Sequence, residues 1–217
     1  MFNQPKKVYL DLDAWQTLPA REISCGMAET IKHACLADGE FFDQLERHMD
    51  EIMALEPRIC EYMAEKNCQI KYRVVMKDER ESGLREVPEE DFYAEFLALK
   101  ISIKIVETVS NYRLLHGEAV AIGLHAAAEL SREMGFLSRE DVSRIVRLLG
   151  RAGLPTEIPE YIDREALIKK LYTDKKVRDG KLRFVIPQEI GRIACFGENN
   201  YAVPVSEETA RRVIAMI

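Results

Sequence analysis

The chain has 217 residues, 47% hydrophobic and 31% charged, which is enough to bury a core as one large domain or two small ones. Its formal net charge of −6 excludes the basic footprint of a nucleic-acid-binding protein. It contains five cysteines without a C-x-x-C pair, no apolar h-region and no apolar run near 18 residues, so we expect a cytoplasmic protein with reduced thiols and no membrane span.

The first third of the chain begins with a short β-type run and continues as helices. Residues 7–13 (KVYLDLD) alternate and are rich in aliphatic side chains, which favours a strand. Apolar residues then recur at helical spacing, and Gly39 and Pro57 mark the breaks between helices. The predicted helices span residues 21–37, 40–55 and 57–77.

Beyond an acidic loop at residues 86–91 (EVPEED), helical patterns dominate again. Ser138 and Asp141 form a capping pair, and two β-type runs flank Gly191 as a predicted hairpin. The fold class is mainly α, one helical domain over residues 1–217 with a small β-hairpin. The predicted helices here are 92–111, 117–134, one from 138 to near 153, 163–172 and one from 206, and the predicted strands are 182–187 and 192–196.

Four ordered blocks carry a resemblance to a known family. They read LPAREISCGMAETIKHACLADGEFF (18–42), NCQIKYRVVMKDERESGLR (67–85), RLLHGEAVAIG (113–123) and DKKVRDGKLRFVIPQEIG (174–191). Together they resemble the C-terminal, substrate-handling half of the 3-dehydroquinate synthase family. The resemblance implies a sugar-phosphate cyclase, a phosphate-eliminating lyase of the shikimate pathway and aromatic amino acid biosynthesis.

Family members also carry an N-terminal, Rossmann-like half whose glycine-rich loops hold NAD. We expect that half to be absent here, because the 11 glycines form no G-x-G-x-x-G after a strand. The chain alone is therefore not expected to bind NAD, which a partner chain would have to supply.

Two histidines of the family pattern are missing. The family has an N-x-G-H-x-x-G-H-A-x-E helix before L-H-G-E, and its histidines bind zinc and transfer protons. Aligned through Glu107, these positions fall on Lys100 and Lys104. Apolar and polar residues alternate over 99–105, which also fits a strand with one exposed face. If the segment is a helix, Lys100, Lys104, Glu107 and Asn111 form a polar stripe that also fits a solvated helix face.

By resemblance, Glu29 and His116 are two of the three zinc ligands, so the metal site is predicted to be incomplete. His33, one helical turn after Glu29, is either a packed side chain or a third ligand. The resemblance also implies basic side chains that bind the anionic groups of the substrate, since Arg offers bidentate contacts and Lys a point charge. Each of these basic residues could equally be a solvated surface charge. These residues are Lys32, Lys71, Arg85 and Lys175, with Lys176 in place of Lys175 if the alignment shifts by one.

Two functional hypotheses follow. The chain is either a cyclase domain that acts on a phosphorylated keto-acid sugar with an NAD-binding partner, or a non-catalytic ligand-binding or interaction module of the same origin. We expect homo- or hetero-oligomers, because the absent half would leave an apolar face exposed. We also expect the Lys100 ammonium to replace the metal's charge beside Glu29, without its Lewis acidity.

Overall fold

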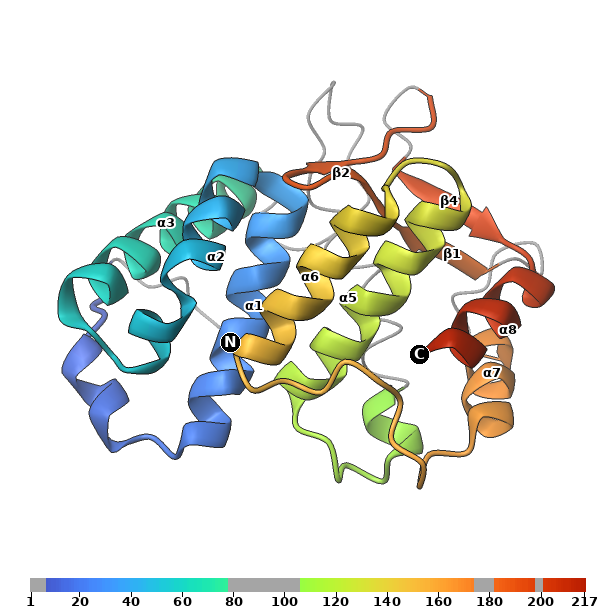
Figure 1. Cartoon of the computed structure of the whole chain (residues 1–217), viewed down its shortest axis with the longest axis horizontal. Coiled ribbons are helices and arrows are strands. Elements are labelled where there is room, and N and C mark those ends of the chain that lie inside the picture. The colour runs from blue at the N-terminus through green and yellow to red at the C-terminus, as the bar shows by residue number, and fades with distance from the viewer. Residues whose placement is uncertain (1–6, 78–105, 174–181, 198–200) are drawn as a thin grey trace.

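The computed structural model describes residues 7–77, 106–173, 182–197 and 201–217. These residues form a mainly helical fold with four short strands (Figure 1). The helices are the 3-10 helix η1 (Leu12–Thr17) and the α-helices α1 (Ala20–Ala37), α2 (Gly39–Met53), α3 (Pro57–Lys77), α5 (His116–Glu133), α6 (Arg139–Arg151), α7 (Arg164–Thr173) and α8 (Glu207–Met216). The strands are β1 (Leu182–Val185), β2 (Pro187–Glu189), β3 (Arg192–Ile193) and β4 (Ala202–Val205).

The helical prediction is confirmed, and side-chain caps explain why the helices begin where they do. The Asp38 carboxylate accepts a hydrogen bond from the Phe41 N–H at the start of α2. The predicted pair of Ser138 and Asp141 forms a reciprocal capping box at the start of α6. Each cap satisfies backbone N–H groups that have no partner inside the helix.

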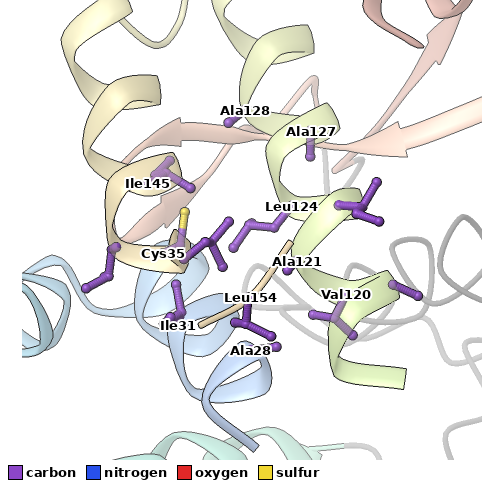
Figure 2. Packing of buried hydrophobic residues seen from close by; sticks show 14 of the residues in the cluster. Ala28, Ile31, Cys35, Val120, Ala121, Leu124, Ala127, Ala128, Ile145 and Leu154 are labelled. Atoms are coloured by element: carbon purple, nitrogen blue, oxygen red, sulfur yellow. The ribbon is translucent and has the colours of Figure 1, made fainter. Parts of the chain in front are cut away.

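The core lies between α1, α5 and α6. Figure 2 shows Ala28 and Ile31 of α1 facing Ala121 and Leu124 of α5, with Ile145 of α6 beside them. All five are fully buried. In Figure 1, α2 and α3 lie on one side of these three helices, next to α1, and the strands with α7 and α8 lie on the other side. The helix α1 packs against α2, α3, α5, α6 and β3.

The strand pairing differs from the prediction. The hairpin across Gly191 exists, but β2 and β3 form it, whereas β1 pairs antiparallel with β4. The pattern gave no sign of β4, because Pro204 lies in the middle of that run. Proline is tolerated there since β1 and β4 form a two-stranded sheet, in which each strand is an edge.

The hairpin turn docks on the end of α1. Gly191 has φ of +93°, and its N–H donates to the Cys35 carbonyl at 2.7 Å. A Cβ at Gly191 would lie 2.1 Å from the Gly39 nitrogen, so only glycine fits this contact between the hairpin and the α1–α2 turn.

The predicted strand at residues 7–13 is not formed among the described residues. Residues 7–10 have no regular secondary structure, and Leu12 and Asp13 belong to η1. The 86–91 loop and most of the predicted helix 92–111 lie outside the described residues. Within the part of the chain that the structure describes, no helix is long and apolar enough to cross a membrane.

Candidate functional site

Three charged or polar side chains project from one face of α1. Glu29, Lys32 and His33 are three and four residues apart, which places them on neighbouring positions of one helical turn. Lys32 and His33 are buried, at 1% and 5% exposure, while the Glu29 side chain is 33% exposed. A buried ammonium and a buried imidazole need partners, and these partners define the candidate site.

Lys32 and Glu29 form an ion pair. The Lys32 Nζ donates to Glu29 Oε2 at 2.6 Å. Burial by itself raises the pKa of the Glu29 carboxyl, but the charge and hydrogen bond of Lys32, with smaller contributions from His33 and His116, lower the pKa below its ordinary value. Glu29 is therefore an ionised carboxylate at neutral pH.

His33 is held by α3. Its Nδ1 lies 2.5 Å from Asn67 Oδ1, and since a carbonyl oxygen accepts, Nδ1 carries the proton. The other ring nitrogen, Nε2, lies 3.7 Å from Glu29 Oε2. Burial lowers the pKa of His33 to about 4, and the positive charge of Lys32 adds to this effect, while the contact with Asn67 opposes it. A neutral His33 thus directs its unprotonated nitrogen toward Glu29.

His116 is arranged in the same way from the opposite side. It opens α5, and its Nδ1 lies 2.7 Å from Glu107 Oε1. Because a carboxylate accepts, Nδ1 carries the proton and Nε2 faces Glu29 Oε1 at 3.5 Å. The His116 side chain is 55% exposed, so this side of the Glu29 carboxylate is open to a ligand.

The residues after His116 explain how α5 reaches the site. A Cβ on Gly117 would lie 2.4 Å from the Cα and O atoms of Cys25, so the missing side chain lets α5 press against the α1 backbone. Glu118 receives two hydrogen bonds from Arg21, at 2.7 and 2.8 Å. These bonds, ahead of smaller effects, lower the pKa of the Glu118 carboxyl. In the H-G-E motif, His116 is therefore a residue of the candidate site, Gly117 allows close contact between α5 and α1, and Glu118 forms an ion pair with Arg21.

The structure brings Glu29, Lys32 and His116 together. Lys71 lies on α3 with an exposed side chain, and its charge acts on His33. Lys32, which the resemblance implies as a substrate contact, is buried and paired with Glu29. The remaining predicted site residues lie outside the described residues: Arg85, Lys100, Lys104, Lys175 and Lys176.

Two residues of the site were not assigned a role from the sequence. Asn67 stood inside a recognised block, and Glu107 served only to align the missing histidines. Asn67 accepts from the His33 Nδ1–H and lies 34 residues from it in the sequence. Glu107 accepts from the His116 Nδ1–H and lies nine residues from it, across a turn. No helical or strand period relates such positions, so they are revealed only by the packing of α3 on α1 and by the turn that leads into α5.

The chain matches the model of the 3-dehydroquinate synthase C-terminal domain over residues 26–88 and 103–177. The chain belongs to the 3-dehydroquinate synthase family. A 3-dehydroquinate synthase from Nostoc punctiforme is 42% identical over 200 residues, covering 91% of this chain and 53% of the relative. One from Desulforamulus reducens is 41% identical over 196 residues, covering 90% and 52%. The chain spans about half the length of these relatives.

Solved structures of two related synthases share the fold. A 2-epi-5-epi-valiolone synthase from Streptomyces hygroscopicus, with NAD⁺ and Zn²⁺ bound, superposes with a TM-score of 0.77 at 22% identity, over 95% of this chain and 54% of that one. A 2-deoxy-scyllo-inosose synthase, complexed with carbaglucose-6-phosphate, NAD⁺ and Co²⁺, gives 0.76 at 21% identity with the same coverage. The mainly helical fold is thus that of the family's C-terminal half.

The described donor atoms do not make a zinc site by themselves. Two donors of a tetrahedral zinc ion stand about 3.3 Å apart, which the 3.5 Å between Glu29 Oε1 and His116 Nε2 nearly matches. A catalytic zinc site, however, needs three protein ligands. Among the residues that the structure describes, no group of three His, Cys, Asp or Glu is placed to hold a metal ion. Lys32 also lies against the second Glu29 oxygen.

Proposed function

We propose that this chain is the substrate-handling half of a 3-dehydroquinate synthase-like sugar-phosphate cyclase, which binds a phosphorylated keto-acid sugar and depends on an NAD-binding partner chain. We further propose that its turnover is impaired. The observation that supports the binding role is the convergence of Glu29, Lys32, His33 and His116 from α1 and α5 at one partly open centre.

The chemistry of this centre suits a polyhydroxylated anion. Glu29 is an ionised acceptor for a ligand hydroxyl, and the His116 Nε2 lies beside it on the exposed side. The exposed Lys71 ammonium adds a positive charge for a phosphate or carboxylate. The fixed Nδ1 protons hold both imidazoles in orientation, so less rotamer freedom is lost when a ligand binds.

Impaired turnover is proposed because lysines stand at positions 100 and 104, where the family pattern has histidines. In the family, zinc acts as a Lewis acid on substrate oxygens, and a lysine ammonium at position 100 would supply charge but has no empty orbital to accept a lone pair. A non-catalytic binding module of the same origin is the second candidate, and the same two substitutions favour it.

The test is a calorimetric titration of the isolated chain with the phosphorylated seven-carbon keto acid of the family reaction. Glu29→Gln and His116→Ala should each weaken binding about tenfold or more, because each removes a hydrogen bond to a charged or polar group in the centre. His48→Ala is the matched control, since His48 contacts only Glu51 among the described ion pairs and lies on α2. Equal affinities in all variants would contradict the proposal.

Turnover is measured separately, with NAD and the N-terminal half of a relative added. We expect no dehydroquinate product above the background of that half alone. A rate comparable to that of a complete relative would show that impairment is the wrong conclusion, while leaving the binding role intact. Zinc titrated into the chain should show no tight, His116-dependent site.

A further inference from the structure

Arg21 joins the two helices that carry the candidate site. It lies in the first turn of α1, about two helical turns before Glu29. Its Nε donates to Glu118 Oε1 at 2.7 Å and its Nη2 to Glu118 Oε2 at 2.8 Å, a bidentate contact with the first turn of α5. The same Nη2 also donates to the Arg113 carbonyl at 3.2 Å. One guanidinium thus contacts the chain on both sides of His116.

His116 depends on its neighbours for its orientation. Its side chain is 55% exposed, so packing restrains it little. Its Nδ1 lies 2.7 Å from Glu107 Oε1, which fixes the ring but not the backbone that carries it. Residues 113–115, which lead into His116, belong to no helix or strand. The position of the His116 backbone therefore depends on the contacts that hold this segment against α1.

Glu118 extends the contact to the residue before His116. Its Oε2, which accepts from Arg21, also accepts from the Leu115 N–H at 2.8 Å. The hydrogen bonds from Arg21 are the main reason that the pKa of the Glu118 carboxyl lies below its ordinary value, so this carboxylate is ionised at neutral pH. The network fixes the start of α5 relative to α1, and with it the distance from His116 Nε2 to the carboxylate that it faces.

A second ion pair has the same form but joins two helices away from the site. At the other end of the 18-residue helix α5, about 25 Å away, Arg212 of α8 makes a bidentate contact with Glu133 at 3.0–3.2 Å. The exposure of the two pairs also matches, since the Arg21 and Arg212 side chains are 56% and 48% exposed and both glutamates 13%. Ion pairs of exposed arginines contribute little to stability, so both pairs should stabilise the fold by similar, small amounts.

We propose that Arg21 is a positioning residue for ligand binding, which holds His116 in place through Glu118 and the Arg113 carbonyl. The inference rests on the proposed function, because that function gives His116 a contact with the phosphorylated sugar. A guanidinium suits this role, since its planar fork binds both carboxylate oxygens while one of its nitrogens still reaches a carbonyl, whereas an ammonium offers a point charge. Binding becomes stronger because a preorganised His116 loses less freedom when the ligand arrives.

The experiment compares Arg21→Gln with Arg212→Gln, which removes the matched pair at the other end of α5. The probe is the phosphorylated seven-carbon keto acid of the family reaction, titrated into each chain by calorimetry, with urea denaturation in parallel. We expect similar, small losses of stability, but weaker binding in Arg21→Gln alone, by about fivefold, which is part of the loss in His116→Ala. Arg21→Lys keeps the charge without the bidentate contact and should weaken binding about as much.

A double variant separates an action through His116 from a direct attraction between Arg21 and an anionic ligand. If Arg21 acts through His116, the Arg21→Gln change has no further effect on affinity once His116 is replaced by alanine. A direct attraction would give the same loss of affinity in both backgrounds and would overturn the proposal. So would an unchanged affinity in Arg21→Gln, or equal losses of affinity in Arg21→Gln and Arg212→Gln.

The orientation of His116 is also measured without ligand, by nitrogen-15 NMR of its imidazole ring. We expect the Nδ1–H tautomer in the wild type, where Glu107 accepts from Nδ1, and the same spectrum in Arg212→Gln. In Arg21→Gln we expect a mixture with the Nε2–H tautomer, and an unchanged His116 spectrum there would overturn the proposal. If the wild-type chain binds no ligand, the proposed function fails, and the His116 spectrum alone decides whether Arg21 is a positioning residue.

Discussion

Gly117→Ala should destabilise the fold although it adds only one methyl group. Gly117 lies in the first turn of α5, where a Cβ would stand 2.4 Å from the Cα and O atoms and 2.7 Å from the carbonyl carbon of Cys25. All three are backbone atoms of α1, which cannot rotate out of the way as a side chain could. The two helices must therefore separate or shift along each other.

The cost follows from the core that this shift disturbs. Ala28 and Ile31 on α1 and Ala121 and Leu124 on α5 are at most 1% exposed. Overpacking of such a contact costs about 1–3 kcal/mol, while alanine in place of glycine in a helix returns about 0.5–1 kcal/mol. We expect a net loss of about 1 kcal/mol, or about 2–4 °C in Tm for a chain of this size.

The matched control is Gly26→Ala in the interior of α1. Its added Cβ would have no heavy atom within 4 Å outside its own helix and chain neighbours, so only the helix preference of alanine acts and stability should rise by about 0.5–1 kcal/mol. Urea denaturation of both variants gives the comparison directly. If Gly117→Ala is as stable as the wild type, or if both variants lose stability equally, the steric reasoning is refuted.

Three further variants test other contacts. Asn67→Leu leaves the buried His33 Nδ1–H without its acceptor and should cost about 1–3 kcal/mol in urea denaturation; an unchanged midpoint would contradict the contact. Glu118→Gln removes the partner of Arg21. Since the folded-state pKa of Glu118 lies below its ordinary 4.5, the wild type should be the more stable protein at neutral pH, and the gap in Tm should close as pH falls below 4.5; a gap independent of pH would argue against the ion pair. Gly191→Ala combines a positive φ with a clash at the α1–α2 turn and should cost about 3 kcal/mol, with loss of hydrogen-exchange protection at its N–H; a neutral substitution would contradict the docking of the hairpin.

The sequence determined the helices, because each carries its own signals. Capping residues such as Ser138 and Asp38 and the 3.6-residue recurrence of apolar side chains act within a few neighbouring residues, so α1, α2, α3, α5 and α6 lie within about two residues of their predicted bounds. The family blocks likewise singled out Glu29, Lys32 and His116, whose side chains lie close together in the structure. Helix signals act between residues that are close in the sequence, and the family blocks are recognised by their order along the chain. Neither depends on which distant segments pack together.

Tertiary structure decided which groups meet. The pairing of β1 with β4, in place of the predicted hairpin partner, and the docking of the Gly191 turn on α1 join segments whose separation no periodic pattern encodes. The orientation of His33 by Asn67 depends on how α3 packs on α1, and that of His116 by Glu107 on the turn that joins residues 106–109 to α5. Lys32 illustrates the difference best. The resemblance implied that it contacts a substrate anion, but only the structure shows that its position on the inner face of α1 buries it, where the Glu29 carboxylate stabilises the ammonium.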